Sequence, residues 1–567
     1  VDSEYISVTP TYTWKCVMSN GTICPFLATE NSPRITFTTN IPDFYNVTVV
    51  FQSIAGRSTS ATIAVEVKAN KIPRVAITSV LSDIVNSKSK ISLRASVEPL
   101  DQYLSGNIVL QWEVRELLSG KRVELNSSTI LTATSTRRSL VLREGVLQSE
   151  TAYSFSVKGK YRDEDDRNMA YSTISARTSK KPKSLSATSF LISPASGISM
   201  ETDFTLSASN WTDDAASLPL RYSFEYYDQQ AKTYRVIVPF DISTNIVTKF
   251  LGPVGAKDNT VQVRLRIKNY FEDEVVIEKT IVVQASQSVG ASTVKNLLSQ
   301  RRADIAQGNT LSRDAGFVMI AAAQLIVTLN DTSTTDVVDE LLQFLNSNST
   351  DSSEEEASQK IDALETLSTN TNILLPQQKA KMSSILTGAI PKSSSGSSSD
   401  SARIASSVSQ LISNLIKADA AEYQSEIAKQ SSDSIQLLST YVLDSIEAGE
   451  QQFAIETESF RLTLQKEYAD GIKSKIVSDQ SNSSVYIPNS NNIESGDQET
   501  VYSVEFLSYP DSSSAIWSNL GENTTTGIVT FKVLDASGQK IAFEASEDDP
   551  LVIVLPRIKS KENGADD

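Results

Sequence analysis

Residues 501–556, VYSVEFLSYPDSSSAIWSNLGENTTTGIVTFKVLDASGQKIAFEASEDDPLVIVLP, show most clearly how this chain folds. Apolar and polar residues alternate in the runs VYSVEFLSY, GIVTFKVLD and PLVIVLP. Turn-forming residues (Pro-Asp, Gly-Glu-Asn and Ala-Ser-Gly) separate these runs. Because side chains alternate between the two faces of a strand, this pattern predicts a series of short antiparallel strands.

The region just upstream is predicted to be helical. Its apolar residues recur three and four positions apart, which is typical of helices packed on one face. A Ser-rich, low-complexity loop interrupts the helices at 392–401, and alternation at 453–468 returns the chain to β structure. We expect helices within 292–329, 333–347, 356–374 and 377–390, and one long amphipathic helix over about 402–448.

Residues 1–286 have the alternation of strands throughout, with turn signals at the spacing of β-sandwiches. Two Pro-bearing linkers, at 68–74 and 179–183, separate this region into three modules. Short linkers of this kind predict a semi-extended rod of sandwiches. The expected fold class is therefore mainly β with a helical block, in a segregated order that is unlike an α/β enzyme.

Composition excludes several classes of function. The chain has 567 residues, a net charge of −16 and no histidine. The acidity argues against nucleic-acid or anionic-lipid binding. The lack of histidine excludes His-based catalysis and His-liganded metals, and two cysteines are too few for a Cys-rich zinc site. We therefore expect no enzyme activity, no catalytic residue, no cofactor and no metal site.

The longest apolar run, at 316–329, is too short for a membrane span, which needs about 20 residues. We expect it to form a buried helix. The chain opens on a strand-like sequence with no visible signal peptide. We therefore take it to be an interior piece of a longer secreted or membrane-anchored protein.

The C-terminal strands also resemble a known family. A strand ending in LSYP, a Trp-bearing loop, a TG-x-V strand, an L-D-x-x-G-x-x-I turn and an I-V-L-P strand resemble the β half of a GAIN domain. The version that they most resemble belongs to the large polycystins and their receptor-for-egg-jelly (REJ) relatives. The resemblance implies an extracellular segment next to a membrane. The family's cleavage motif, His-Leu followed by Ser or Thr, has no counterpart here, so we expect no self-cleavage.

The N-terminal modules carry a second part of the resemblance. Tyr12–Cys16 (YTWKC) together with Cys24 is similar to the Trp-x-Cys element of REJ and PKD-type sandwiches. A pattern in the third module is similar to the REJ pattern of P-x-x-G, F-x-L, W-x-D and P-L-x-Y-x-F, although Ser-Asn precedes Trp211 where a cysteine often stands. Its matching positions are Pro194, Gly197, Phe204, Leu206, Trp211, Asp213, Pro219, Leu220, Tyr222 and Phe224.

The resemblance implies five domains. They are a PKD/Ig-like sandwich at 1–70 that we expect to be partial, a fibronectin-like sandwich at 72–181, an egg-jelly-type sandwich at 183–286, a GAIN helical subdomain at 288–450 and a GAIN β-sandwich subdomain at 451–558.

An extracellular placement predicts two covalent features. In a secretory context, Cys16 and Cys24 are expected to form a disulfide within the first module. Asn-x-Ser/Thr sequons are candidate N-glycosylation sites, the weakest being Asn210 because it adjoins Trp211, which we expect to be buried. The candidate sites are Asn20, Asn46, Asn126, Asn210, Asn330, Asn348, Asn482 and Asn523.

Two acidic clusters and four tryptophans allow a second interpretation. Asp163–Asp166 and the pair Asp213 and Asp214 could bind calcium, but a solvated loop tip and a hydrogen-bonded turn are the favoured readings. The tryptophans could be carbohydrate platforms, but sandwich cores commonly bury one. We expect Trp14, Trp112 and Trp211 to pack in cores, and we leave Trp517 open because its loop is polar.

The expected function is that of an extracellular stalk or receptor region of a polycystin-like membrane protein. It would anchor or transmit external contacts to a ciliary or flagellar channel complex. The resemblance implies protein partners, namely a channel-type polycystin subunit or a filamentous glycoprotein, and membrane attachment through segments outside this chain. The alternatives are an adhesion-receptor GAIN ectodomain and a secreted structural or appendage glycoprotein. A carbohydrate-active enzyme would need paired carboxylates in a cleft, and no spacing nominates a pair.

Overall fold

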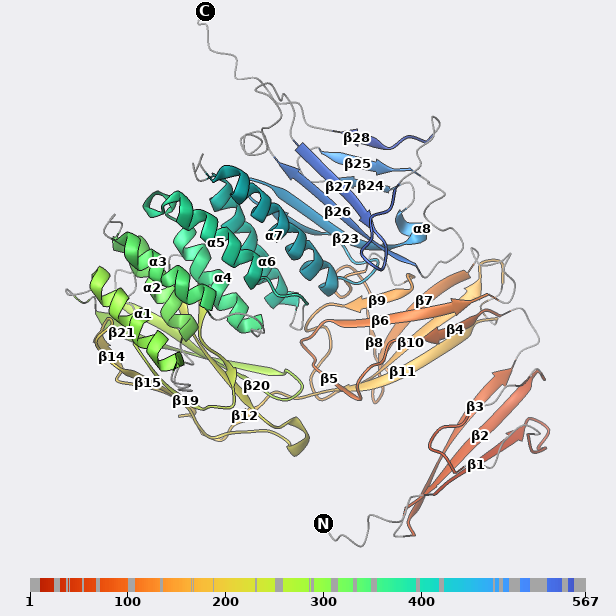
Figure 1. The fold of residues 1–567 in the computed structure, drawn as a ribbon. Helices are drawn as coiled ribbons and strands as arrows, with labels where there is room; N and C mark the ends of the chain where they lie inside the picture. The colour runs from red at the N-terminus through yellow and green to blue at the C-terminus, as the bar shows by residue number, and fades with distance from the viewer. Residues whose placement is uncertain are drawn as a thin grey trace, which may run out of the picture. The chain divides into compact units, whose positions relative to one another are not determined.

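The computed structural model is mainly β, with one block of helices in the C-terminal half of the chain (Figure 1). This confirms the predicted fold class. No helix of the described residues is long and apolar enough to cross a membrane. The structure describes residues 11–24, 31–36, 39, 41–53, 56–67, 72–99, 108–132, 136–164, 166, 168–186, 188–229, 232–249, 259–284, 286, 290–306, 315–329, 334–347, 354–393, 398–417, 423–472, 475–478, 483–488, 500–509, 528–542 and 549–554.

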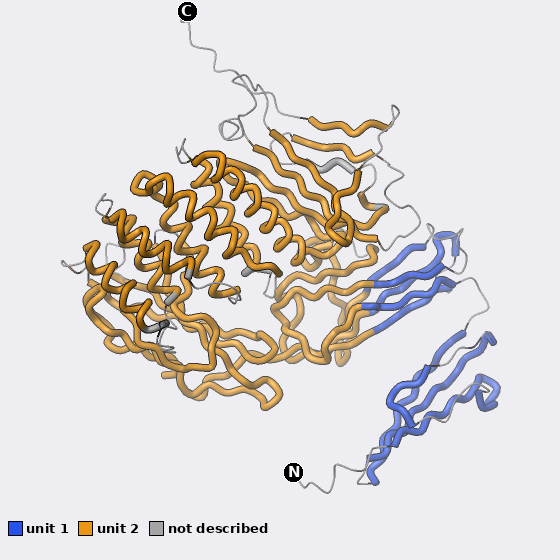
Figure 2. The backbone as a smooth tube through the Cα atoms, in the orientation of Figure 1, with its two compact units in different colours: residues 1–78, 95–112, 156–173 blue, residues 79–94, 113–155, 174–567 orange. Residues whose placement is uncertain are grey.

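The chain divides into two compact units (Figure 2). Unit 1 comprises residues 1–78, 95–112 and 156–173, and unit 2 comprises residues 79–94, 113–155 and 174–567. Unit 1 begins with an antiparallel sheet in the order β1-β2-β3, formed by β1 (Thr11–Met18), β2 (Asp43–Gln52) and β3 (Ser58–Val67).

The strands from residue 74 to residue 178 form two sheets, in the orders β4-β6-β9 and β5-β11-β10-β7-β8. The longest of them, β10, buries every second residue, as its alternation predicts. The strands are β4 (Arg74–Ile77), β5 (Ile84–Val85), β6 (Ile91–Glu98), β7 (Ile108–Glu116), β8 (Arg122–Val123), β9 (Ser139–Leu142), β10 (Ala152–Tyr161) and β11 (Ala170–Thr178).

The next strands, all in unit 2, form a sandwich whose main sheet has the order β14-β21-β20-β17-β18. A smaller sheet, β13-β15-β19, contributes Phe190 and Phe204 to the same core as Phe224. The strands are β12 (Lys183–Ser184), β13 (Phe190–Ser193), β14 (Ser196–Ile198), β15 (Phe204–Ala208), β16 (Trp211–Thr212), β17 (Arg221–Asp228), β18 (Thr233–Asp241), β19 (Asn245–Thr248), β20 (Thr260–Lys268) and β21 (Glu274–Gln284).

The helical block follows, and its most apolar helix, α2, is buried as predicted. The helices are α1 (Ala291–Ala306), α2 (Ala315–Leu329), α3 (Thr335–Ser347), α4 (Glu354–Ser368), α5 (Pro376–Ala389), α6 (Ser398–Lys417) and α7 (Gln424–Ser445).

The prediction of one long helix over 402–448 is wrong. Helix α6 ends at Lys417, α7 begins at Gln424, and the two helices pack against each other. A single helix of that length would extend roughly 70 Å at 1.5 Å per residue. Two shorter helices instead turn both apolar faces, represented by Leu411 and Leu438, into one core.

The C-terminal strands form two sheets, in the orders β22-β23-β26-β27 and β24-β25-β28. Leu462, Leu464 and Leu507 of the first sheet belong to the same hydrophobic core as the helical block. The elements are β22 (Phe453–Glu456), β23 (Arg461–Tyr468), α8 (Ala469–Ile472), β24 (Lys475–Ser478), β25 (Ser484–Ile487), β26 (Val501–Tyr509), β27 (Ile528–Leu534) and β28 (Val552–Val554).

Contacts between distant residues hold unit 2 together. The Lys90 ammonium lies 2.9 Å from the Glu450 carboxylate, and the Ser139 and Tyr468 hydroxyls lie 2.5 Å apart. The expected semi-extended rod is therefore wrong within this unit. The short linkers allow the chain to fold back, so that polar side chains of separate modules meet and are buried together.

Candidate functional site: interaction surfaces and buried junctions

In the acidic loop near residue 163, acidic side chains form an ion pair and a hydrogen bond with neighbouring residues. Lys160 forms an ion pair with Asp166 at 2.5 Å, and Asn168 donates a hydrogen bond to the Glu164 carboxylate at 2.9 Å. Asp165 lies outside the described residues. Nowhere in the described ranges do three or more His, Cys, Asp or Glu side chains gather so that they could hold a metal ion.

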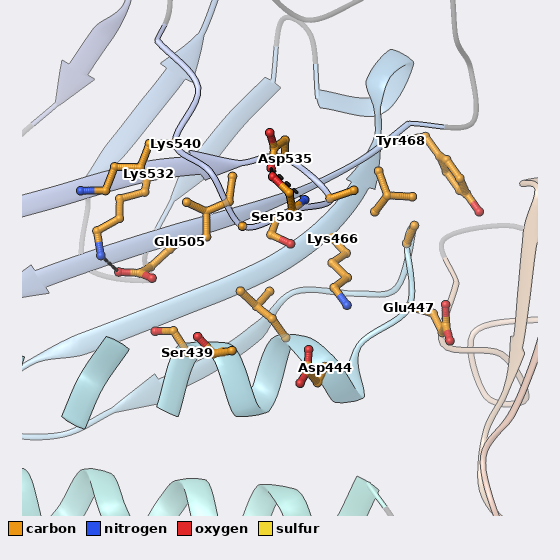
Figure 3. Close-up of a pocket in the computed structure, with 18 of the residues that line it drawn as sticks. Ser439, Asp444, Glu447, Lys466, Tyr468, Ser503, Glu505, Lys532, Asp535 and Lys540 are labelled. Atoms are coloured by element: carbon orange, nitrogen blue, oxygen red, sulfur yellow. Dashed lines mark hydrogen bonds and ion pairs between the residues drawn. The ribbon is translucent and has the colours of Figure 1, made fainter. Parts of the chain in front are cut away.

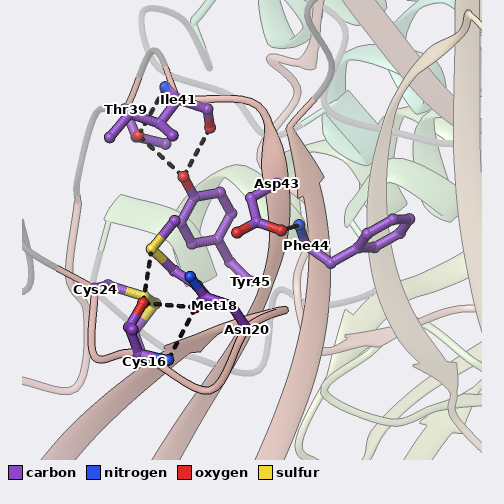
Figure 4. Close-up of a disulfide and its surroundings, with 10 residues drawn as sticks. Cys16, Met18, Asn20, Cys24, Thr39, Ile41, Asp43, Phe44 and Tyr45 are labelled. Carbon is purple, nitrogen blue, oxygen red and sulfur yellow. Dashed lines mark hydrogen bonds between the residues drawn. A yellow bond between two sulfur atoms is a disulfide. The ribbon is translucent and has the colours of Figure 1, made fainter.

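Residues 16–24 form a disulfide-bonded hairpin at β1, an edge strand of the first sheet (Figure 4). Cys16 and Cys24 are bonded, with their Cα atoms 5.4 Å apart, and both are buried. The Cys24 amide donates to the Cys16 carbonyl at 3.1 Å, and the Met18 amide donates to the Thr22 carbonyl at 2.8 Å. The hairpin therefore supplies partners to backbone groups of β1 that would otherwise lie at an open strand edge.

The sequons that the structure describes are all exposed. They are Asn20, Asn46, Asn126 and Asn210. At Asn20 the side-chain oxygen accepts a hydrogen bond from the Thr22 hydroxyl at 2.6 Å, and at Asn126 it accepts one from the Ser128 hydroxyl at 2.5 Å. Asn210 is exposed although its neighbour Trp211 is half-buried. The other candidates, Asn330, Asn348, Asn482 and Asn523, lie outside the described residues.

The tryptophans are packed to different degrees. Trp112 is buried, whereas Trp14 and Trp211 are half-buried. The indole N–H of Trp14 donates to the Ser32 carbonyl at 2.8 Å, and that of Trp211 donates to the Ser189 carbonyl at 3.1 Å. These two side chains are therefore engaged with their own modules. Trp517 lies outside the described residues.

A buried ion cluster joins the third sandwich to the helical block. The Arg235 guanidinium on β18 lies 2.9 Å from Asp362 on α4 and 3.4 Å from both Asp228 on β17 and Glu365 on α4. Arg403 on α6 approaches Asp362 from the other side at 3.4 Å. The cluster therefore links strands β17 and β18 to helix α4 through Arg235, and Asp362 in turn links α4 to α6 through Arg403.

The environment of this cluster favours a charged arginine. Burial opposes the charge of Arg235, but Asp362 and Glu365 outweigh burial and raise the pKa of Arg235. Burial raises the pKa of Glu365, while Arg235 opposes that change. A charge this deeply buried is tolerated only when it is paired and hydrogen-bonded.

Hydrogen bonds from two glutamines extend the same junction. The Gln324 amide on α2 donates to Asp228 at 2.7 Å, and its oxygen accepts from the Tyr226 hydroxyl at 3.2 Å. The Gln359 amide on α4 donates to the Val236 carbonyl at 3.1 Å. Burial raises the pKa of Tyr226 above its usual range, so this hydroxyl stays protonated. The third sandwich and the helical block thus share a mostly buried junction, in which these polar contacts lie beside the apolar contact of Phe317 on α2 with the Tyr226 ring.

A second polar junction surrounds the linker at 179–183. The Ser179 hydroxyl donates to Asp273, which is fully buried. The Asn269 amide bridges the Lys180 carbonyl and the Asp213 carboxylate, both at 2.9 Å. Lys180 also pairs with Asp214 at 2.5 Å. Asp213 therefore accepts a hydrogen bond from Asn269, and Asp214 forms an ion pair with Lys180.

A groove of about 520 Å³ lies where the end of α7 faces strands β23, β26 and β27 (Figure 3). On its wall Lys532 pairs with Glu505 at 2.6 Å. Burial lowers the pKa of Lys466, although Glu447 and Asp444 oppose the change. Both acidic and basic side chains line the groove, so it has no charge of one sign that would select an ionic ligand.

The sequence did not reveal the junction residues. Arg235 stands within the apolar strand run TYRVIVPF, and Asp362 lies among the buried residues of α4. A charge inside an apolar pattern signals an interior group that needs a partner. That signal could have marked Arg235 and Asp362, but it could not have paired them.

Comparison with known proteins gives one family. The model of the REJ domain matches residues 7–312. No curated protein sequence matches the chain at a significant level.

Several solved structures of tandem modules resemble part of the chain. Titin domains A168–A170 are 15% identical, with a TM-score of 0.20, over 48% of this chain and 89% of theirs. The chicken CNTN1 FN1–FN3 domains are 13% identical, with a TM-score of 0.21, over 48% of this chain and 88% of theirs. A two-domain fibronectin type III segment of chicken tenascin is 19% identical, with a TM-score of 0.15, over 37% of this chain and 97% of its own.

Proposed function

This chain belongs to the REJ-domain family, and from that premise we propose that it is an extracellular stalk or receptor region of a polycystin-like membrane protein. The match over residues 7–312 is the observation that carries the proposal. The buried disulfide and the four exposed sequons agree with a secretory surface. The absence of histidine from the sequence argues against His-based chemistry in this region.

The domain assignment is part of the proposal. It divides the chain at the boundaries 1–70, 72–181, 183–286, 288–450 and 451–558, the last two being the helical and sandwich halves of a GAIN-like domain. The shared core of the helices with Leu462, Leu464 and Leu507 supports treating these two halves as one domain.

The role proposed for this region is to hold or transmit external protein contacts at a ciliary or flagellar membrane. Its partner would be a channel-type polycystin subunit or a filamentous glycoprotein. Support comes from the junctions of unit 2, which are built of buried ion pairs and hydrogen bonds. Because such junctions resist rotation of one module against the next, a contact made on one module moves its neighbours with it.

Purification of the native protein from membranes in mild detergent tests the proposal. We expect an antibody against this region to recover it with a membrane-spanning continuation and a co-purifying channel subunit or filament protein. Recovery from the medium as a lone soluble glycoprotein would overturn the receptor role and favour a secreted structural protein. Surface labelling of intact cells, before and after removal of cilia, tests the location separately.

A further inference from the structure

The connection between α7 and β22 is held by residues from a distant part of unit 2. We call residues 445–451 of this connection the strap, and we call Lys90, Leu131 and Thr132 the clasp. The Lys90 ammonium donates to the Glu450 carboxylate at 2.9 Å and also to the Ser445 carbonyl. One cation, the Lys90 ammonium, therefore contacts the strap at Ser445 and at Glu450.

Backbone contacts add to this ion pair. The Gln451 amide donates to the Leu131 carbonyl at 3.0 Å, and Thr132 and Glu450 form an antiparallel bridge. The strap thus pairs with the clasp as a one-bridge strand addition. Because these bonds run through main-chain atoms, they set the register in which the ion pair holds the strap.

The ion pair of the clasp is well shielded from water. Side-chain exposure is 16% for Lys90 and 8% for Glu450. The same Glu450 oxygen accepts the Glu447 amide at 2.8 Å, which bends the strap back on itself. The bend passes through Gly449, whose φ of +85° is a conformation that favours glycine. Ion pairs at this depth are screened by salt much less than exposed pairs are.

A second contact lies beyond the strap, at the end of β23. The Ser139 and Tyr468 hydroxyls lie 2.5 Å apart, and the Arg94 guanidinium lies over the Tyr468 ring, 5.6 Å from its centroid. Arg94 and Ser139 are register partners in the pairing of β6 with β9. The clasp residue Lys90 stands immediately before the same strand pair. The β6–β9 strand pair therefore contacts β23 directly, and Lys90, the residue before β6, contacts the strap.

These contacts connect the β6–β9 ladder with residues 445–468, which lie far from it in the sequence. Along the chain, Lys90 and Glu450 are 360 residues apart, separated by the linker at 179–183, the third sandwich and the helical block. We propose that the clasp and strap form a latch that couples the β6–β9 ladder directly to the C-terminal sheet. Displacement of the ladder is then passed to the end of α7 and to β22 and β23 without passing through the third sandwich.

The latch predicts a defined released state. Without Lys90, the carboxylate of Glu450 and the carbonyl of Ser445 lose their shared donor, and the strap leaves the clasp. Neither the core of the helices nor the β23–β26 pairing depends on these atoms, so both stay folded. The latch deepens the proposed function, and its biological meaning rests on that function.

Hydrogen exchange of the full chain, read by mass spectrometry over residues 445–452, tests the latch. The variants are Lys90→Ala, Lys90→Glu and the swap Lys90→Glu with Glu450→Lys. We expect both single variants to speed exchange of the Gln451 amide at least tenfold. The swap should restore part of the protection, because it restores the ion pair but not the bonds to the Ser445 carbonyl and from the Glu447 amide. The control Lys249→Glu disrupts an exposed pair, with Asp203 at 3.6 Å, and should leave the strap unchanged.

Two results would overturn the latch. One is unchanged exchange of the strap in Lys90→Glu. The other is faster exchange that spreads equally through α2 and β23, which would show general destabilisation instead of release. The experiment measures hydrogen exchange in the isolated chain and therefore tests only the latch. Its failure is therefore distinguishable from failure of the proposed membrane role, which is read by recovery from native membranes.

Discussion

Arg235 of β18 and Asp362 of α4 form an ion pair at 2.9 Å, with side chains only 3% and 1% exposed. Taking both charges out of water costs several kcal/mol, which their attraction and the surrounding hydrogen bonds must offset. Asp228, Glu365 and Arg403 complete the cluster. The pair therefore specifies how the third sandwich sits on the helices, more than it adds net stability.

Removal of Arg235 should strongly lower the stability of the protein. In Arg235→Ala, the carboxylates of Asp228 and Asp362 remain buried without their main cation. We expect a loss of about 3–5 kcal/mol in the free energy of unfolding, because an uncompensated buried charge is costly. Urea unfolding followed by tryptophan fluorescence and circular dichroism measures the loss.

A matched control lies in the same module. Lys249 pairs with Asp203 at 3.6 Å, and both side chains are well exposed. Lys249→Ala should cost no more than about 1 kcal/mol, because exposed pairs contribute little. Equal losses in the two variants would mean that the cluster around Arg235 is not the specific tie between sandwich and helices.

The buried Asp273 should give the protein a characteristic dependence on pH. Burial is the main cause that raises the pKa of Asp273 to about 6 from 3.8; Lys181 and Lys88 oppose it, and Asp213 adds to it. Between these two values the folded protein binds a proton that the unfolded chain releases. The contribution of Asp273 to stability therefore falls as the pH rises through this window.

Asp273→Asn isolates that contribution. The variant keeps a side-chain oxygen for the Ser179 hydroxyl and cannot titrate. We expect the stability of the wild type, measured relative to this variant, to decrease from about pH 4 to about pH 6 and then to level off. Unfolding in urea at several pH values gives the difference. A difference that is flat across the window would show that Asp273 does not carry the titration.

Local patterns predicted the elements of this fold better than the contacts between them. Alternation identified strands such as β10, and apolar spacing identified α2 and α3. The break between α6 and α7 was missed because residues 418–423, ADAAEY, contain neither Gly nor Pro. Their composition favours a continuous helix, whereas α6 and α7 each turn an apolar face into one core.

The junctions could not be predicted for a different reason. The pairs Arg235 with Asp362 and Lys90 with Glu450 join residues far apart in the chain. A single sequence shows that a charge stands in an apolar setting, but it does not show which opposite charge the fold brings to it. The pairing of Cys16 with Cys24 needed only local signals and is confirmed, and the sequons, also local signals, stay predictions of glycosylation.

Glycosylation should follow exposure. Asn20 and Asn126 are exposed in turns where a Thr or Ser hydroxyl already contacts the asparagine oxygen. We expect glycans at both, and also at the exposed Asn46 and Asn210. Mass spectrometry after enzymatic deglycosylation in heavy-oxygen water marks each occupied site by conversion of Asn to Asp. Unmarked asparagines in protein from native membranes would remove this support for an extracellular location.

The disulfide should stabilise the first sheet locally. Cys16 and Cys24 enclose a short loop, so the chain-entropy effect of the bond is about 2–3 kcal/mol. Replacing both residues with Ser should therefore raise hydrogen exchange in β1 and β2 while leaving α2 and β23 unchanged. Non-reducing peptide mapping of the wild type should recover the two cysteines in one linked fragment. Two free thiols in native protein would contradict the bond.

The helical block and the C-terminal sheet should lose their structure together. Leu462 of β23 is fully buried in the core that it shares with α2, α6 and α7. Leu462→Ala should lower the stability of this core by about 2–5 kcal/mol, since removal of a buried leucine leaves a cavity. Leu437→Ala on the outer side of α7, where the leucine is 38% exposed, is the control and should lower the stability much less.

In Leu462→Ala, hydrogen exchange should rise in the helices by as much as in β23 and β26. Limited proteolysis of the wild type should not cut between α7 and β22. If the sheet opens while the helices keep their protection, the two halves are separate domains, and the GAIN-like assignment fails.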